Sequence, residues 1–255
     1  QDYRYPISHN QKYVIPDNVQ TGDYVGVFHV NFTDSITEIN PSYTGTAYTF
    51  RIAGDYSAFA IHHSSGLITV NNESDIKYGE DHHLKIEITE GHRKQTYVAK
   101  IHVANPEKTV FVDYGYAGTE RGTREQPFNH YMKDVYGNGL LTSGTYVFIK
   151  RGETCHNGDH IYVRDPGTVL KNVVITAYGK GPKPVLQGNN YSVRVAGGIG
   201  LGSNYNEDTI SNIFISDFEI TRYDGGFVRT HTECKEIKLH RLYGHGNVEA
   251  TNYGT

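Results

Sequence analysis

Four short apolar runs recur in the second half of the chain, and their spacing limits the folds that this half can adopt. They begin at positions 147, 173, 213 and 237, so successive starts are 26, 40 and 24 residues apart. A period in the mid-twenties is typical of a β-solenoid, in which each coil adds a strand to a shared core. We expect the interval of 40 residues to hold one coil with a large inserted loop, placed at residues 197–208. The runs are Val147–Lys150, Val173–Thr176, Ile213–Ser216 and Ile237–His240.

The first half of the chain has a different pattern, in which apolar and polar residues alternate. Such alternation predicts strands with one buried face. Several short strands separated by turn-forming residues favour a β-sandwich of about 100 residues. The alternating runs are residues 24–30, 47–52, 84–88 and 98–103.

Length and composition fit two all-β domains. A chain of 255 residues is long enough for two domains. Tyr is abundant at 21 residues and Gly at 28, which suits strands and tight turns. Pro106 prevents the preceding strand from continuing as a central one. We therefore expect a sandwich over residues 1–105 and the repeat domain over residues 108–255.

Charge and hydropathy bear on partners and location. The 24 basic and 28 acidic residues give a formal net charge of -4, whereas nucleic-acid-binding domains usually carry a basic patch. No apolar run reaches the roughly 18 residues that would predict a membrane span. Because the chain starts at Gln1 with neither Met nor a signal sequence, we expect a processed chain that is secreted or at the cell surface. An artificially trimmed chain would look the same.

Two cysteines and five short motifs leave several possibilities open. Cys155 and Cys234 fit either a disulfide or two buried thiols, and no Cys/His spacing resembles a zinc site. Three sequons are N-glycan acceptors in an exported protein, and two Asp-Ser/Thr-Ile triplets resemble the short O-glycosylation signal of exported bacterial proteins. Patterns this short also arise by chance. The acceptor residues are Asn31, Asn72, Asn190, Ser35 and Thr209.

Residues 59–70 resemble the cadherin stretch F-x-I-x-x-x-x-G-x-I, and residues 84–91 resemble the following strand with its acidic turn. The resemblance implies a cadherin-like sandwich over the first hundred residues. Cadherin repeats bind calcium, which requires six to eight oxygen ligands. On this alignment Asp75 and Glu90 match two acidic ligands, but Lys77 stands at a third ligand position. The terminal Asp-x-Asn-Asp-Asn is also missing, so we expect a spacer with an incomplete calcium site and no other cofactor.

Residues 146–153 and 175–188 are similar to the opening coils of right-handed parallel β-helix proteins, the pectate-lyase-like family in the broad sense. Residues 122–128 match the turn that follows the first strand in that family. The resemblance implies a helix over residues 129–137 that caps the first coil, because an uncapped coil exposes its core and strand edges.

The last two coils contain the residues that could act on a polysaccharide. Lyases on this fold need a Lys or Arg base, and glycoside hydrolases need two carboxylates. Asp217 and Glu219 are two residues apart, so on one strand they would share a face, as would Lys238 and His240. Outward polar residues of any coil look the same, and the fold alone implies no activity. The candidate set is Asp217, Glu219, Lys235, Lys238, His240 and Arg241.

Two main hypotheses follow. The first is an extracellular structural or adhesive protein, such as a fibre or cell-surface subunit, that associates with itself or with a neighbouring surface protein. The alternative is the N-terminal part of a secreted lyase or hydrolase that acts on an anionic polysaccharide. A carbohydrate-binding module without turnover is a third option, which the 21 Tyr residues favour and the absence of Trp disfavours.

Overall fold

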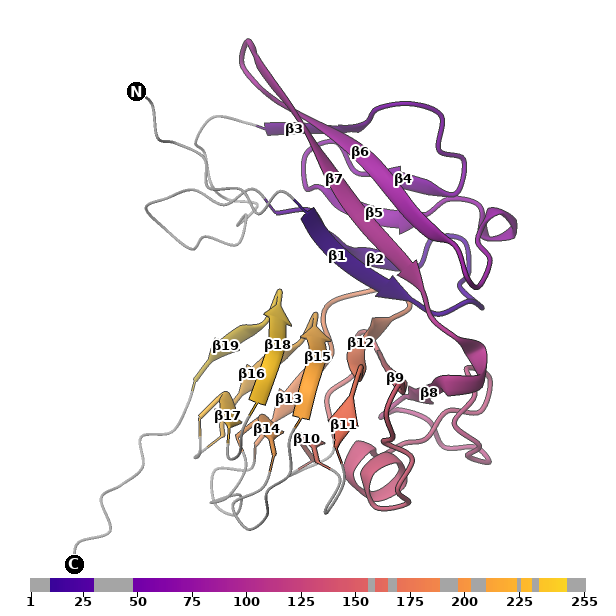
Figure 1. Ribbon diagram of the computed structural model, residues 1–255, viewed down its shortest axis with the longest axis vertical. Helices are drawn as coiled ribbons and strands as arrows, with labels where there is room; N and C mark the ends of the chain where they lie inside the picture. Colours follow the sequence, from indigo (N-terminus) through magenta and orange to yellow (C-terminus); the bar gives the residue numbers. More distant parts are fainter. Residues whose placement is uncertain are drawn as a thin grey trace, which may run out of the picture. The chain divides into compact units, whose positions relative to one another are not determined.

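The computed structural model describes residues 10–29, 48–155, 159–164, 169–188, 197–202, 210–223, 226–230 and 234–246. The chain divides into two compact units, Gln1–Pro106 and Glu107–Thr255. Both are built of strands, with three short helical turns in the described residues (Figure 1). The chain is therefore an all-β protein.

Unit 1 contains two sheets, with strand orders β1-β7-β6-β3 and β2-β5-β4. All its strand pairs are antiparallel except β1 with β7. The four alternating runs of the sequence lie in β2, β3, β6 and β7. The strands are β1 (Asn10–Ile15), β2 (Tyr24–Val27), β3 (Tyr48–Ile52), β4 (Phe59–Ile61), β5 (Leu67–Val70), β6 (Asp81–Glu90) and β7 (Arg93–Val103).

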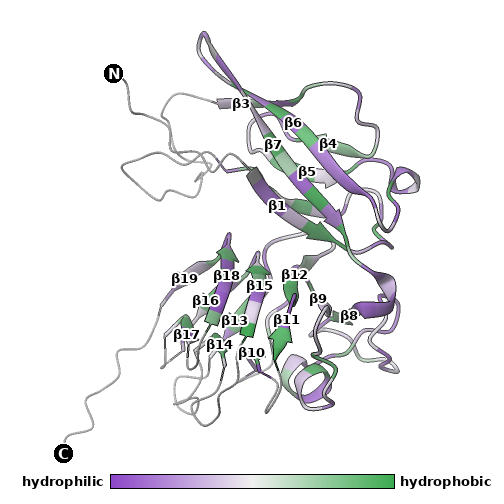
Figure 2. Ribbon diagram, in the orientation of Figure 1, coloured by the Kyte–Doolittle hydropathy of each residue, from purple (hydrophilic) through white to green (hydrophobic). Residues whose placement is uncertain are grey.

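The core of unit 1 follows directly from the alternation. Leu84 and Ile86 of β6 and Ile101 of β7 are completely buried, whereas Lys85 and Lys100 between them are exposed. Figure 2 shows hydrophobic and hydrophilic residues in turn along these strands. Each fully buried aliphatic side chain contributes about 1.5–3 kcal/mol, so the register that buries this set is strongly preferred.

The glycine of the cadherin-like motif has a steric role. Gly66 lies in the turn between β4 and β5 with φ 68°. A Cβ at this position would be 2.8 Å from the carbonyl oxygen of Phe28. Only glycine meets both requirements without strain, which explains why this residue type stands here.

Unit 2 contains three sheets in which all strand pairs are parallel: β8-β9-β12-β15, extended by β18 and by the short β11, then β13-β16-β19 and β10-β14-β17. The chain runs through the three sheets in a fixed order, and we call one such circuit a pass. The order is β12, β13, β14, then β15, β16, β17, then β18, β19. The strands are β8 (Thr109–Val112), β9 (Tyr146–Lys150), β10 (Ile161–Val163), β11 (Leu170–Lys171), β12 (Val174–Tyr178), β13 (Val185–Gln187), β14 (Ile199–Leu201), β15 (Ile210–Ser216), β16 (Glu219–Thr221), β17 (Val228–Thr230), β18 (Cys234–His240) and β19 (Tyr243–His245).

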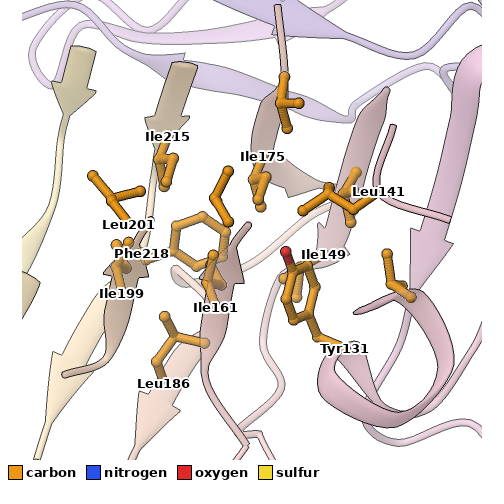
Figure 3. Packing of buried hydrophobic residues seen from close by; sticks show 14 of the residues in the cluster. Tyr131, Leu141, Ile149, Ile161, Ile175, Leu186, Ile199, Leu201, Ile215 and Phe218 are labelled. Atoms are coloured by element: carbon orange, nitrogen blue, oxygen red, sulfur yellow. The ribbon is translucent and has the colours of Figure 1, made fainter. Parts of the chain in front are cut away.

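Side chains from all three sheets form one apolar core in unit 2. Ile175 and Ile215 from the first sheet, Leu186 from the second and Ile199 from the third point into the same interior (Figure 3). All four are completely buried. Because each sheet contributes one inward row per pass, no single pass could form a core by itself.

The repeat measured from the sequence needs two corrections. Ile175 lies opposite Val147 and Ile215 opposite Ile175, so the first apolar run is shifted by two residues against the others. A shift of two keeps the same side chains facing inward, which is why the apolar pattern alone did not reveal it. The expected inserted loop at 197–208 was also wrong in part, since Ile199–Leu201 form β14. Residues 203–208 lie outside the described part of the chain.

A short helix forms where the sequence predicted one. Tyr131–Tyr136 form a single π-helical segment, and its Tyr131 and Val135 side chains belong to the core of unit 2. The carboxylate of Asp159 accepts hydrogen bonds from the backbone N–H groups of Tyr131 at 2.9 Å and Met132 at 3.0 Å. The first N–H groups of a helix have no partner within it, so Asp159 satisfies them from another part of unit 2.

Successive passes repeat an uncommon backbone conformation at equivalent positions, two of them within β15 and β18. Asn172, Asn212 and Glu236 have φ of 57°, 52° and 54°, and Asp217 and Arg241 have φ of 69° and 52°. Non-glycine residues adopt this left-handed region infrequently. The Asn212 side chain donates a hydrogen bond to Asn172 Oδ1 at 2.5 Å. Equivalent positions of two passes are thus joined by their own side chains.

Candidate functional site

Asp217, Glu219, His240 and Arg241 lie where β15 and β18 end and the next strands begin, whereas Lys235 and Lys238 lie within β18. Asp217 follows the last residue of β15 and precedes β16, which starts at Glu219. The expectation that Asp217 and Glu219 share one face of a strand is therefore wrong. The left-handed φ of Asp217 breaks the alternation between them. Asp217 is buried and Glu219 is partly exposed.

Asp217 is the centre of a buried ion cluster. Arg241 donates from Nε to Asp217 Oδ1 at 2.9 Å and from Nη2 to Oδ2 at 2.7 Å. Arg151 Nη2 lies 3.4 Å from Asp217 Oδ1. The side chains of Asp217, Arg241 and Arg151 are only 4%, 5% and 6% exposed. Fork-shaped contacts of this kind are the strong form of ion pair.

The strand register explains how these charges meet. Ser216 lies opposite His240 in the pairing of β15 with β18. The next residues, Asp217 and Arg241, therefore occupy the same corner of consecutive passes. The backbone N–H of Asp217 also donates to the carbonyl of His240 at 3.2 Å. The strand register and the opposite charges therefore both bring Asp217 and Arg241 together.

The environment of Asp217 keeps it ionised. Burial opposes ionisation, but the charge and hydrogen bonds of Arg241, together with Arg151, hold the pKa of this carboxyl well below its usual range. Thr176 Oγ1 lies 2.8 Å from Ser216 Oγ and donates to Asp217 Oδ2 at 3.5 Å. A carboxylate that is buried and held this strongly is a poor general base. Its chemistry is that of an electrostatic link between passes.

The basic candidates have different surroundings. Lys235 and Lys238 lie exposed on β18, and His240 lies two residues after Lys238. The His240 ring contacts Phe214 with a centroid distance of 5.3 Å. Burial, followed by the charges of Arg241 and Lys238, lowers the pKa of His240. His240 is therefore neutral at neutral pH, and Asp217, the carboxylate expected to act with it, is bound to Arg241.

Glu219 takes part in a different pair, on the surface. Glu219 Oε1 lies 2.8 Å from His245 Nε2, and the Tyr243 ring lies 5.0 Å from the His245 ring. Glu219 lies opposite Tyr243 in the register of β16 with β19. A partly exposed carboxylate–imidazole pair can transfer protons, so Glu219 and His245 retain acid–base potential.

Arg151 is the member of the cluster that the sequence did not suggest. It directly follows the first apolar run, just as Asp217 and Arg241 follow the third and fourth. A charged residue after three of four repeated runs was the available signal. Since the first run is shifted by two residues, the repeat does not by itself bring Arg151 to Asp217.

The two cysteines do not form a disulfide. Cys155 is buried, and its sulfur accepts a hydrogen bond from the backbone N–H of Gln187 at 3.0 Å. Burial raises the pKa of the Cys155 thiol to about 11. Thiolates are the reactive form of cysteine, so Cys155 is a core residue and not a nucleophile.

The two calcium candidates of unit 1 are engaged in separate hydrogen bonds. Asp75 Oδ2 accepts from Ser57 Oγ at 2.5 Å and from Asn72 Nδ2 at 2.9 Å. Glu90 accepts from the Tyr48 hydroxyl at 2.9 Å, and it lies at the far end of β6 from Asp75. Within the described ranges, no three His, Cys, Asp or Glu residues form a group that could hold a metal ion.

The structure describes one of the five glycosylation candidates. Asn72 precedes a 3-10 turn (Glu73–Asp75), and its Oδ1 accepts from the backbone N–H of Ser74 at 3.3 Å. Its Nδ2, the atom that would carry a glycan, donates to Asp75. The other four candidates, Asn31, Ser35, Asn190 and Thr209, lie outside the described residues.

Comparison with known proteins gives a weak likeness to cadherins. No family model and no curated protein matches the chain. The human Desmocollin-1 ectodomain matches with 17% identity over 46% of this chain and 24% of that structure, at a TM-score of 0.31. The Protocadherin GammaB4 extracellular domain matches with 15% identity over 48% and 20%, at 0.32. Drosophila N-cadherin EC1-4 matches with 15% identity over 45% and 30%, at 0.28. The chain thus spans less than a third of each, and at these TM-scores the likeness carries no functional conclusion.

The described residues also contain no helix long and apolar enough to cross a membrane. The strands and sheets make this chain an all-β protein. The solved structures to which it is similar include cadherin ectodomains.

Proposed function

We propose that this protein is an extracellular structural or adhesive subunit. In this proposal a cadherin-like spacer, residues 1–105, precedes the first coils of a right-handed parallel β-helix, residues 108–255. Support for the second part comes from three parallel sheets that the chain visits in a fixed order around one core. Repeated left-handed corners also fit coils that are stacked on one another.

One observation favours a structural role over catalysis. Asp217, the best carboxylate candidate, is buried and clamped by Arg241 from the next pass. A catalytic base needs access to substrate and a pKa near the working pH. Asp217 has neither. Instead it links two consecutive passes of the chain through its contacts with Arg241.

Self-association is the interaction that this role implies. In the described part of the chain β18 pairs with β15. Leu239 of β18 is 38% exposed and Tyr243 of β19 is 44% exposed. An exposed strand that carries apolar side chains is a template for adding a further strand. A second copy of the chain or a neighbouring surface protein would supply that strand.

Sedimentation velocity and negative-stain imaging of the full chain test this proposal. We expect concentration-dependent assembly that Leu239→Lys weakens, while Lys180→Glu, an exposed change elsewhere in unit 2, leaves it intact. A monomer at all concentrations would overturn the proposal.

A second candidate function is polysaccharide cleavage at the Glu219–His245 pair. It rests on the 2.8 Å contact and the partial exposure of both side chains. Incubation with uronate polymers would then release unsaturated or reducing-end products, and Glu219→Gln or His245→Ala would abolish the release. Turnover that both variants lose would replace the structural proposal, whereas turnover that neither variant changes would exclude this pair.

A further inference from the structure

The outward face of the four-stranded sheet in unit 1 is unusually basic. Its side chains alternate with the buried row, so the register of β1, β7, β6 and β3 identifies them. The face carries five cations and two carboxylates, a net charge of +3, on a chain whose formal net charge is -4. The cations are Lys12, Arg51, Lys85, Lys94 and Lys100, and the carboxylates are Asp81 and Glu87.

One end of this face is partly neutralised. Glu87 Oε2 accepts from Arg51 at 2.9 Å, and Glu87 Oε1 accepts from Lys94 at 3.4 Å. At the other end, Asp81 Oδ1 lies 2.6 Å from His102 Nδ1. The hydrogen bond with His102 and, to a smaller degree, the charges of His83 and Lys12 lower the pKa of Asp81, so this carboxylate also faces the cations between the two ends.

Between these two ends lies a row of basic side chains, which we call the basic row: Lys12, Lys100, His83 and Lys85. Lys12 lies directly opposite Lys100, and Lys100 lies directly opposite His83. All four side chains are exposed. Lys12 and Lys100 carry like charges directly opposite each other, an arrangement that by itself destabilises a sheet.

We propose that the basic row binds an anionic polysaccharide through its carboxylate or sulfate groups. Neighbouring strands are about 4.8 Å apart, and alternate residues along a strand are about 7 Å apart. The row therefore presents a sparse line of cations on a flat surface. Lysine is a flexible point charge without the fixed fork of arginine, which suits anionic groups whose positions vary along a polymer.

Other polyanions fit the row less well. Double-stranded DNA carries one charge about every 1.7 Å and is usually bound by many phosphate contacts. Three lysines and one histidine supply few such contacts, and no aromatic side chain of the row offers a base-stacking platform. A membrane surface calls for exposed apolar anchors beside the cations, whereas the apolar neighbours of the row are the half-buried Val98 and Val14, which is only 3% exposed.

The test measures binding of the full chain to heparin and to polygalacturonate, which separate sulfate from carboxylate recognition. We expect binding to at least one polymer at low salt, and weakening as salt rises. Lys85→Glu or Lys100→Glu should each weaken binding about fivefold or more, and Lys12→Glu with Lys100→Glu about twentyfold or more. Circular dichroism and thermal melting show whether each variant folds.

Two matched controls separate the row from net charge. Lys94→Glu lies on the same strand and face but in the neutralised end, and Lys180→Glu lies in unit 2. Both should change binding less than twofold. Equal weakening by the controls, no binding to either polymer, or tighter binding to duplex DNA would overturn the proposal. The proposed assembly of unit 2 is measured separately by sedimentation, so either proposal can fail without the other.

Discussion

The two units place their charges and their strained residues differently. In unit 1 the described residues with positive φ are all glycines, and its ion pairs lie on an exposed sheet face. In unit 2 six non-glycine residues have positive φ, and three charged side chains meet inside the fold. Exposed pairs contribute little to stability, whereas a buried charge must keep its partner. The same interaction type therefore has different weight in the two units.

The largest expected effect comes from removing the buried negative charge. Asp217→Asn keeps the size of the side chain but leaves Arg241 and Arg151 without their counter-charge. Loss of one partner from a buried ion pair costs about 3–5 kcal/mol. Chemical denaturation of the full chain measures this loss as the change in the free energy of unfolding of unit 2.

The matched control is Glu87→Gln in unit 1, which removes the carboxylate from an exposed network. We expect little change in stability from this variant. Similar losses for the two variants would show that burial of the Asp217 cluster is not what distinguishes the units.

Lowering the pH should remove the same stabilisation gradually. Because the pKa of Asp217 is lower in the folded protein than in the unfolded chain, the unfolded chain binds the proton more tightly between these two values. The contribution is complete above the unfolded pKa of about 3.9 and declines by about 1.4 kcal/mol per pH unit below it. The stability gap between wild type and Asp217→Asn should therefore hold from pH 7 to pH 5 and shrink below pH 4. A gap that closes between pH 7 and pH 5 would contradict the lowered pKa.

A smaller effect tests the left-handed residue within β15. Asn212 has φ 52° and bonds to Asn172. Asn212→Ala loses the hydrogen bond and places an ordinary residue in the left-handed region, at about 1–2 kcal/mol. Asn212→Gly loses the bond without the strain, and should cost less. If the alanine variant is as stable as the glycine variant, backbone strain at position 212 does not affect stability.

These results show which parts of the molecule the sequence could predict. Alternation in residues 84–88 predicts β6 because one buried face has a period of two. The apolar runs locate β9, β15 and β18 for the same reason. The pattern reports the inward face of a strand, and a shift of two residues between strands leaves that face unchanged. The pairing register between strands is therefore the property that the apolar pattern could not predict.

The candidate site was predicted less well, because its geometry depends on a backbone turn and on distant strands. Asp217 and Glu219 would share a face only on a continuous strand, and the left-handed φ of Asp217 ends the strand between them. Arg151 reaches Asp217 from an earlier pass of the chain. Neither fact is encoded in local spacing.

The smallest expected effect is that of calcium on unit 1. A bound cation would raise the melting temperature in proportion to the logarithm of its concentration above the dissociation constant. Asp75 and Glu90 are held by Ser57, Asn72 and Tyr48, and Lys77 stands at the third acidic position of the resemblance. Six to eight oxygen ligands are needed, so millimolar calcium should leave the melting curve of the chelator-treated protein unchanged. Magnesium at the same concentration controls for ionic strength. A calcium-specific rise of several degrees in the melting temperature would show that unit 1 contains a cation site. Both units would then contain charges that are held in place by strong contacts.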